Sequence, residues 1–481
     1  MRAWLWAATA GLIVVYLAAA GLSTFERVRN GAEFLYGEAI VLDEVHRIGL
    51  GQPLYAPPTA LPLTITAYPP LYYLLVAAVQ QLTGDPGYGP GRLVSVAAML
   101  VSAGLLAWIV HRVAGGRWSG GLLAAGLFLT QNLTVLLWLP VHRVDPLALC
   151  LTLVGLALAT SGRTTLAALP CMLAVLTKQT YLAAPLCVLV TLWPRRRLML
   201  AGGAVFVASL SVCLAAGEWL TNGELLWHTV VANANPLDFQ YFAAMFGAFL
   251  QFNALPLIAA LALFGLPARG PERVWRAYFV VSGLEALATI GKLGASSNYW
   301  LELTAATCVL IGILAVRLAE RQPNPDRGRS PFTSTGLASV IVASLLTCVP
   351  AYQATVSQAL ELHVGGATGS IGPQLEVAPL VAAEPDAVLT DDPGLALLAG
   401  KRVEFEFVIF TILATQGVWD EAPIVNAIDA RQFGLVVLEE SLDEPPRPLI
   451  AARLTPRVRA ALQAAYTPAG QQAGYWFYRP N

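Results

Sequence analysis

The fold is organised around residues Gly31 to Tyr73, GAEFLYGEAIVLDEVHRIGLGQPLYAPPTALPLTITAYPPLYY, which follow the first long apolar run of the chain directly. In residues 32–50, apolar side chains recur at steps of three and four, which predicts an amphipathic helix lying in the membrane interface. The stretch also gathers ionisable side chains in a chain with only 12% charged residues, namely Glu33, Glu38, Asp43, Glu44, His46 and Arg47. Charge held beside a membrane is costly, so its concentration here indicates a functional site.

Two adjacent acids stand in the middle of this predicted helix. Asp43 and Glu44 are consecutive, so their side chains project about 100° apart and cannot share one direction. Asp43 lies within side-chain reach of His46 and Arg47, which follow it by three and four residues. We therefore expect one carboxylate to face a substrate while the other is held by a neighbouring side chain.

The composition is that of a polytopic α-helical membrane protein. Of the 481 residues, 56% are hydrophobic and 12% are charged, whereas a soluble domain has about 25% charged residues. The formal net charge of −1, without a basic tract, predicts no nucleic-acid partner. The six cysteines all lie in apolar runs and form no C-x-x-C pair, which predicts core residues and neither a disulfide framework nor a metal site.

Run length and the placement of arginines predict about eleven membrane helices. Their ranges are 4–22, 93–110, 122–138, 147–159, 164–177, 181–193, 198–216, 242–266, 278–290, 301–316 and 337–349. The arginine clusters, of which Arg195–Arg197 is the strongest, then share one side, which predicts a multi-pass cell-membrane protein with a cytoplasmic N-terminus. A crossing at Pro70–Leu82 would invert every later cluster, so this short run is interpreted as a re-entrant or interfacial helix. The first run is long enough to span, which favours an uncleaved anchor over a cleaved signal peptide.

Two domains are predicted. Residues 1–350 form the membrane domain, whose first outer loop covers residues 23–92, and residues 322–331 are a polar linker. Residues 351–481 have the composition of a small soluble α/β domain, which this topology places on the extracytoplasmic side. Its predicted elements are three short buried strands and one helix, at Ala387–Thr390, Gly434–Glu439, Gly474–Tyr478 and Val458–Ala465.

Further ionisable side chains within or beside the membrane collect on the predicted outer side, namely Arg92, His142, Arg143, Asp145, Lys178, Lys292 and Glu302. For Arg92 and Arg143 the alternative is to anchor helix ends in lipid headgroups. Asp145 precedes a proline, which is also typical of a helix N-cap, and Glu302 has the alternative of an ion pair with Lys292. Lys178 stands between two short apolar helices, from where it cannot easily reach water, and this favours a phosphate partner.

The outward position of these groups separates three classes of function. A transporter or flippase of lipid-linked sugars needs polar groups near the midplane, but the predicted cytoplasmic halves of the helices are nearly bare of acids. A non-catalytic partner, whose outer domain recruits an enzyme, has no need of Lys178 or of the acidic loop. An enzyme that acts on a lipid-linked substrate at the outer face uses acids as a base and cations for a leaving phosphate, and this class is favoured.

Several motifs resemble those of the GT-C glycosyltransferases. The run Leu-Asp-Glu-Val-His at residues 42–46, followed by Tyr-Pro-Pro-Leu-Tyr-Tyr at residues 68–73, is similar to the protein O-mannosyltransferases and to the bacterial aminoarabinose and related lipid-sugar transferases. The turn at 142–145, the segment 177–179 and the run 297–302 resemble later motifs of the bacterial branch. The similarity covers about residues 1–320, and the C-terminal domain does not resemble the β-trefoil of the eukaryotic mannosyltransferases.

The resemblance implies a GT-C fold and an inverting glycosyltransferase. Such an enzyme moves a sugar from a polyprenyl monophosphate carrier to an acceptor hydroxyl on a glycan, a lipid or a protein, at the outer face of the membrane. Some relatives use a divalent metal and others do not, and no spacing of His or Asp in this chain decides between the two.

The resemblance also implies roles for single residues. By position, Asp43 is the general base and Glu44 supports it, while Asp145 helps to shape the acceptor side. Lys178, together with Arg92 or Arg143, neutralises the departing lipid phosphate. The other residues expected to bind substrate are His46, Tyr72, Asn298, Tyr299 and Glu302.

Overall fold

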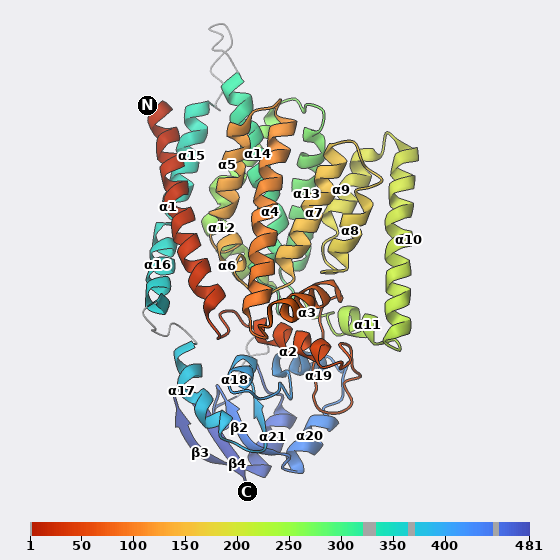
Figure 1. Ribbon diagram of the computed structural model, residues 1–481, viewed down its shortest axis with the longest axis vertical. Coiled ribbons are helices and arrows are strands. Elements are labelled where there is room, and N and C mark those ends of the chain that lie inside the picture. The colour runs from red at the N-terminus through yellow and green to blue at the C-terminus, as the bar shows by residue number, and fades with distance from the viewer. Residues whose placement is uncertain (1, 321–332, 364–370, 446–451) are drawn as a thin grey trace.

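The computed structural model describes residues 2–320, 333–363, 371–445 and 452–481, so the predicted linker at 322–331 lies outside the described residues. Two parts follow one another along the longest axis of the molecule (Figure 1). A bundle of helices makes up the larger part, and a small α/β domain near the C-terminus makes up the other. The predicted class, a helical membrane domain with a small α/β domain, is confirmed.

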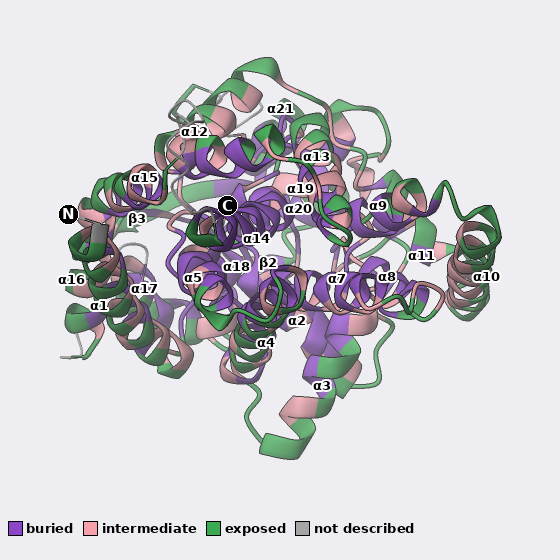
Figure 2. Cartoon of the chain, turned by 90° about the horizontal axis from the view of Figure 1, so that it is seen from above, coloured by how far each residue is buried: buried purple, intermediate pink, exposed green. Residues whose placement is uncertain are grey.

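The bundle is built from helices that run roughly along the long axis (Figure 1). They are α1 (Arg2–Arg29), α4 (Gly89–Val113), α5 (Trp118–Leu129), α7 (Asp145–Thr160), α8 (Ala168–Val175), α9 (Ala183–Leu192), α10 (Arg196–Leu220), α12 (Phe239–Leu261), α13 (Glu272–Thr289), α14 (Leu301–Glu320) and α15 (Ser334–Thr347). Helix α14 is buried along nearly its whole length, whereas α10 buries no residue and stands at the edge (Figure 2). The bundle is therefore packed around α14.

Close packing in the centre depends on small side chains. Gly120 of α5 and Gly312 of α14 face each other so closely that a Cβ on either would come within 2.6 Å of the other's carbonyl oxygen. Helices in a membrane gain little from hydrophobic burial against each other, so they pack through such close backbone approaches.

Five helices among the described residues are long and apolar enough to cross a membrane alone. These are Ala3–Arg29, Gly89–Val113, Arg196–Leu220, Phe239–Gly265 and Ser297–Glu320; the bent pair of α15 and α16 (Val349–His363) counts as a sixth if it is one span. The other bundle helices are shorter. A multi-pass membrane protein is thus confirmed, and the number of eleven crossings stays a prediction.

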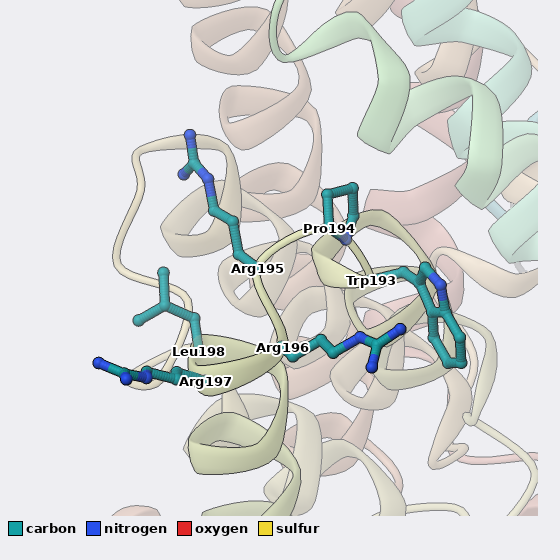
Figure 3. Close-up of a pocket in the computed structure, with 6 residues that line it drawn as sticks. All are labelled: Trp193, Pro194, Arg195, Arg196, Arg197 and Leu198. Carbon is teal, nitrogen blue, oxygen red and sulfur yellow. The ribbon is translucent and has the colours of Figure 1, made fainter.

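The predicted orientation places the Arg195–Arg197 turn and the C-terminal domain on opposite sides of the membrane. This turn joins α9 to α10, at the end of the bundle remote from the C-terminal domain (Figure 1). Its three guanidinium groups point in different directions around the chain (Figure 3). The two markers therefore lie at opposite ends of the bundle, as the predicted topology requires.

Short helices lie between the bundle and the C-terminal domain (Figure 1). They include α2 (Glu38–Gly49), α3 (Leu71–Thr83) and α11 (Glu224–Leu226). Smaller pieces elsewhere in the membrane domain are α6 (Val135–Trp138), a π-helix at Trp227–Val231 and 3₁₀ turns at Ala262–Gly265 and Ser297–Trp300. Helix α2 falls within the predicted amphipathic stretch and buries the apolar Val41, Leu42 and Val45. Helix α3 begins directly after Pro70 and has 13 residues, too few to cross a bilayer.

The C-terminal domain contains one sheet of four strands in the order β1-β2-β4-β3. Strands β1 (Ala387–Thr390) and β2 (Phe433–Leu438) are parallel, while β4 (Tyr475–Pro480) is antiparallel to both β2 and β3 (Tyr466–Gln472). The helices are α17 (Ile371–Ala382), α18 (Pro393–Leu398), α19 (Phe407–Thr415), α20 (Ala422–Asp429) and α21 (Pro456–Ala465). The three predicted strands and the helix are present, and β3 was missed because it is polar and mostly exposed.

The two parts are joined by backbone pairing. Leu63 of the first outer loop pairs in parallel with Phe405: its N–H donates to the Glu404 carbonyl at 2.8 Å, and its own carbonyl accepts from the Glu406 N–H at 3.1 Å. The first outer loop therefore holds the C-terminal domain in place. The predicted boundary at residue 350 falls at the start of α16, which still packs against α1 through stacked rings of Tyr16 and Tyr352.

Candidate functional site

A cavity of about 530 Å³ lies where the bundle, the first outer loop and the C-terminal domain meet. Its walls come from segments far apart in the chain, around residues 35–44, 65–73, 138–143, 178–180, 233–241, 292–299, 406–412 and 452–453. A second hollow of about 580 Å³ is lined by only one continuous segment, Trp193–Leu198, at the far end of the bundle (Figure 3). Convergence of many segments on polar groups is typical of a functional site, so the first cavity is the candidate.

Glu44 projects from α2 into this cavity. The side chain is almost fully buried, and neither carboxyl oxygen has a hydrogen-bond partner within the described residues. Burial raises the pKa of Glu44 to about 8, although the Arg47 guanidinium opposes this rise. The Tyr73 hydroxyl, also without a partner there, lines the same cavity. Buried polar groups normally have partners, so these two are positioned to bind a ligand.

The neighbouring Asp43 is turned away from the cavity. Arg47, one helical turn later, binds its Oδ2 through Nη2 at 2.5 Å and through Nε at 2.9 Å. The expected division, with one carboxylate held by a neighbour and the other facing a cavity, is thus present. The carboxyl that faces the cavity is that of Glu44, however, whereas the resemblance gave the role of base to Asp43. His46 contacts the Pro86 carbonyl at 2.7 Å and does not line the cavity.

Lys178 reaches the cavity from the turn between α8 and α9. Its Nζ lies 2.6 Å from Asp145 Oδ1, and Asn298 Nδ2 donates to the same oxygen at 2.8 Å. The ammonium also lies 4.5 Å from the ring centroid of Tyr299. Lys178, Asn298 and Tyr299, which were predicted to bind substrate, line the cavity, while Asp145 is fully buried behind them.

The alternative interpretation of Asp145 as a helix N-cap is wrong. Val144 is the cap residue of α7, and no side chain caps this helix. The Asp145 carboxylate instead holds Lys178 and Asn298, so it fixes the direction of a cation that faces the cavity.

Arg143 is a second cation of the cavity wall. Its Nη2 donates to the Tyr68 hydroxyl at 2.9 Å, and its Nε is buried without a partner in the described part of the chain. Gly37, with φ +94°, leaves room for this guanidinium, because a Cβ there would collide with Nη1. Lys292 also lines the cavity, so the bundle and its connecting turns supply three cations to it. Such a set suits an anion, and a phosphate group above all.

Glu302 does not line this cavity, and its expected ion pair with Lys292 is absent from the described residues. The Tyr278 hydroxyl donates to Glu302 Oε1 at 2.9 Å. Glu302 and Glu285 instead line a separate hollow of about 20 Å³ behind Lys178. In the described ranges, no group of three or more His, Cys, Asp or Glu side chains is arranged to hold a metal ion.

Arg92 belongs to the scaffold rather than to the cavity. Its guanidinium is fully buried and binds both carboxyl oxygens of Glu38 at 2.9 Å. It also donates to the carbonyls of Arg27, Asn30 and Ala32, each at 2.7 Å. All five guanidinium donors are therefore engaged, which leaves none for a substrate phosphate and corrects the prediction for Arg92.

Two tyrosines of the Tyr-Pro-Pro-Leu-Tyr-Tyr motif line the cavity, but Tyr72 is not one of them. The Tyr72 hydroxyl donates to the Gly91 carbonyl at 3.2 Å, inside the scaffold. The cavity receives Tyr68 and Tyr73. The motif predicted that tyrosines of this segment belong to the site, but it could not show which of their rings face the cavity.

No local sequence signal marked Glu406 and Arg453, which the C-terminal domain contributes to the cavity wall. Glu406 Oε1 accepts from the N–H of Ile65, a residue 341 positions earlier in the chain. Contacts over such a separation depend on how the two domains dock. Gln179, next to Lys178, was also overlooked; it lines the cavity and donates to the carbonyls of Ala67 and Thr229.

Comparison with known proteins places this fold. No protein-family model matches the sequence, and no curated protein is significantly similar to it. Among solved structures, ArnT from Cupriavidus metallidurans bound to undecaprenyl phosphate is similar with a TM-score of 0.64 at 14% identity, over 97% of this chain and 98% of that chain. The same ArnT in the apo state gives a TM-score of 0.64 at 13% identity, over 98% of both chains.

A more distant similarity is to the apo oligosaccharyltransferase of Archaeoglobus fulgidus, with a TM-score of 0.52 at 11% identity, over 98% of this chain and 74% of that chain. At these identities the similarity shows the fold alone. The chain has the GT-C fold over nearly its whole length, as the motifs predicted.

The scaffold position of Arg92 leads to a testable prediction. In Arg92→Met the Glu38 carboxylate stays buried without its partner, so we expect the free energy of unfolding to fall by about 3–5 kcal/mol. Thermal unfolding of the detergent-solubilised protein measures this. The control is Arg117→Met, which removes a half-exposed arginine 3.6 Å from Glu320 and is expected to cost no more than about 1 kcal/mol. Equal stability of the two variants would contradict the structural role of Arg92.

Proposed function

We propose that this protein is an inverting glycosyltransferase that moves a sugar from a polyprenyl monophosphate carrier to an acceptor hydroxyl at the extracytoplasmic face of the cell membrane. The observation that carries the proposal is one cavity in which an unpartnered, buried carboxyl, that of Glu44, is combined with the cations Arg143, Lys178 and Lys292. The fold shared with ArnT, whose structure holds undecaprenyl phosphate, supports a lipid phosphate as the anion.

The cations form the donor side of the proposed site. As the bond between sugar and phosphate breaks, negative charge grows on the lipid phosphate, and fixed cations stabilise it most strongly where water is excluded. Lys178 is held in one direction by Asp145, and Arg143 is held by the Tyr68 hydroxyl while its Nε has no protein partner in the described residues. Both groups are thus preorganised, so little rearrangement is needed during the reaction.

Glu44 is the proposed general base. Its carboxylate takes the proton from the acceptor hydroxyl while the acceptor oxygen forms a bond to the anomeric carbon. The bond from that carbon to the phosphate oxygen breaks on the opposite face, the lipid phosphate leaves, and the configuration at the carbon inverts. A base works best when its pKa lies near the working pH, and the pKa of about 8 for Glu44 meets this condition.

Asp43 supports the base indirectly in this proposal. It binds Arg47, and the charge of Arg47 keeps the pKa of Glu44 from rising further. The two acids therefore exchange the roles that the sequence resemblance gave them. The physical reason is the direction of α2, which turns Glu44 toward the cavity and leaves Asp43 beside Arg47.

The proposed reaction is tested with purified protein and a panel of polyprenyl-phosphate sugars, each incubated with a mixture of glycan and lipid acceptors, with and without EDTA. We expect at least one donor to release free polyprenyl phosphate together with a glycosylated acceptor, because the cavity combines a base with cations for a leaving phosphate. Uptake or flipping of the donors in sealed vesicles, without release of lipid phosphate, would instead support a transporter.

Substitution of the two acids separates their roles. Glu44→Gln keeps the shape of the side chain but cannot take a proton, so we expect kcat to fall by about 10²–10⁴-fold. Asp43→Asn removes the charge that binds Arg47 and that raises the pKa of Glu44, and we expect a loss of no more than about tenfold, in line with an indirect electrostatic role. Folding of both variants is checked by size-exclusion chromatography. Near wild-type turnover in Glu44→Gln, with inactivity in Asp43→Asn, would return the role of base to Asp43.

The buried position of Glu44 also predicts the pH dependence of the reaction. The base must be deprotonated, so kcat/KM should rise with pH and level off above a midpoint near 8, which reflects the raised pKa of Glu44 in the free enzyme. The pH profile of lipid-phosphate release measures this, with thermal stability recorded at each pH as the control. A midpoint at the ordinary glutamate value of 4.5 would exclude Glu44 in its buried state as the base.

A further inference from the structure

The C-terminal domain supplies part of the cavity wall. Its polar contributions are Glu406 and Arg453, and its apolar contributions come mainly from α19, namely Val408, Ile409 and Ile412. Arg453 is bound to Glu439 at 2.8 Å and lies over the ring of Tyr36. The domain is therefore a structural part of the cavity, and Glu406 is the acid that it adds.

Glu406 is fixed by the connection between the two domains. Its backbone N–H donates to the Leu63 carbonyl at 3.1 Å, and its Oε1 accepts from the Ile65 N–H at 3.3 Å. Only 3% of the residue is exposed to solvent. The carboxyl is thus held at a defined place in the wall, immediately before α19.

The charged neighbours of Glu406 show at which end of the cavity it lies. The charges that act most strongly on its carboxyl are those of α2, from Glu44, Arg47 and Asp43. Burial and the nearby Glu44 both raise the pKa of Glu406 well above its ordinary value. Two carboxyl groups, those of Glu44 and Glu406, therefore line the cavity close to the charges of α2.

A second buried acid beside the first is costly for the fold. Burial of a carboxyl without full compensation is unfavourable, and the proximity of Glu44 adds repulsion whenever both groups are charged. The hydrogen bond from Ile65 does not require a carboxyl, since any carbonyl oxygen would accept it. Acids whose pKa is shifted in this way cluster at functional sites. Glu406 is therefore a candidate for binding a ligand.

We propose that Glu406 binds the acceptor, and that the acceptor is a carbohydrate. This inference rests on the proposed function. The Glu406 carboxyl hydrogen-bonds a hydroxyl group next to the hydroxyl that Glu44 deprotonates. Neighbouring hydroxyl groups on one ring are characteristic of sugars, and the apolar side chains of α19 beside Glu406 suit the C–H face of a sugar ring.

The test compares Glu406→Ala with Glu406→Gln. Methyl glycosides of a set of hexoses and pentoses serve as acceptors, and release of polyprenyl phosphate from the donor found active for the wild type is the readout. We expect Glu406→Ala to raise the acceptor KM about tenfold, the value of one lost hydrogen bond. The amide of Glu406→Gln can still donate and accept, so it should stay within about threefold of wild type. The donor KM should change less than twofold in both variants.

Glu404→Ala is the matched control. Glu404 lies two residues earlier and joins the domains through its backbone carbonyl, but its side chain does not line the cavity. We expect wild-type acceptor and donor KM values for this variant. A thermal unfolding curve for each variant separates a lost substrate contact from a loosened domain. If Glu406→Ala does not fold, Glu406→Asp, which draws the carboxyl back by one methylene, should raise the acceptor KM instead.

Two results would overturn the inference while the proposed function stands. One is an unchanged acceptor KM in Glu406→Ala, or in Glu406→Asp if the former does not fold. The other is an equal rise of donor and acceptor KM, which would assign the carboxyl to the donor sugar. No transfer by the wild-type protein with any donor overturns the proposed function and this inference together.

Discussion

The buried ion pair of Arg92 and Glu38 is the interaction on which the arrangement of the site depends. Arg92, near the start of α4, binds the end of α1 through the Arg27 and Asn30 carbonyls and holds Glu38, the first residue of α2. Glu38 in turn accepts from the backbone N–H of His142, the residue before Arg143. One pair of charges thus fixes the rotation of α2 and the position of the turn that carries a cavity cation. A buried ion pair whose donors are all engaged fixes the relative positions of the segments it joins, and it adds little net free energy of folding.

The rotation of α2 decides the chemistry of two adjacent acids. Consecutive residues on a helix point about 100° apart, so once Glu38 is fixed, Asp43 meets Arg47 while Glu44 enters the cavity. The same sequence on a helix rotated by one residue would turn Asp43 toward the cavity and Glu44 away from it. The base and the cations of the proposed reaction come from different segments, and a scaffold of buried polar contacts sets the distance between them.

These relations explain how much the sequence alone could predict. Apolar run lengths and arginine placement predicted the helical bundle and the short α3, and periodicity predicted α2, because each depends on local composition. The sequence predicted that Asp43 and Glu44 point in different directions, but not which of the two faces the cavity. That depends on how α2 is rotated, which the contact of Glu38 with the distant Arg92 determines. Arg92 and Arg143 look alike in sequence, but only the fold gives Arg92 five protein acceptors. Glu406 could not be predicted because the docking of two domains brings it to Ile65.

The composite wall also constrains how the two proposed substrates meet. The bundle and its connecting turns supply Arg143, Lys178 and Lys292, so a lipid phosphate whose tail stays in the bilayer reaches its cations from the membrane side. The acceptor must then approach from the side of α2 and the C-terminal domain, because an inverting displacement needs it opposite the leaving group. Glu44 lies on α2 and thus on the acceptor side, as the proposed base must. The pairing of Leu63 with Phe405 therefore matters for more than domain attachment, because it sets the distance between an acceptor held by Glu406 and the base that deprotonates it.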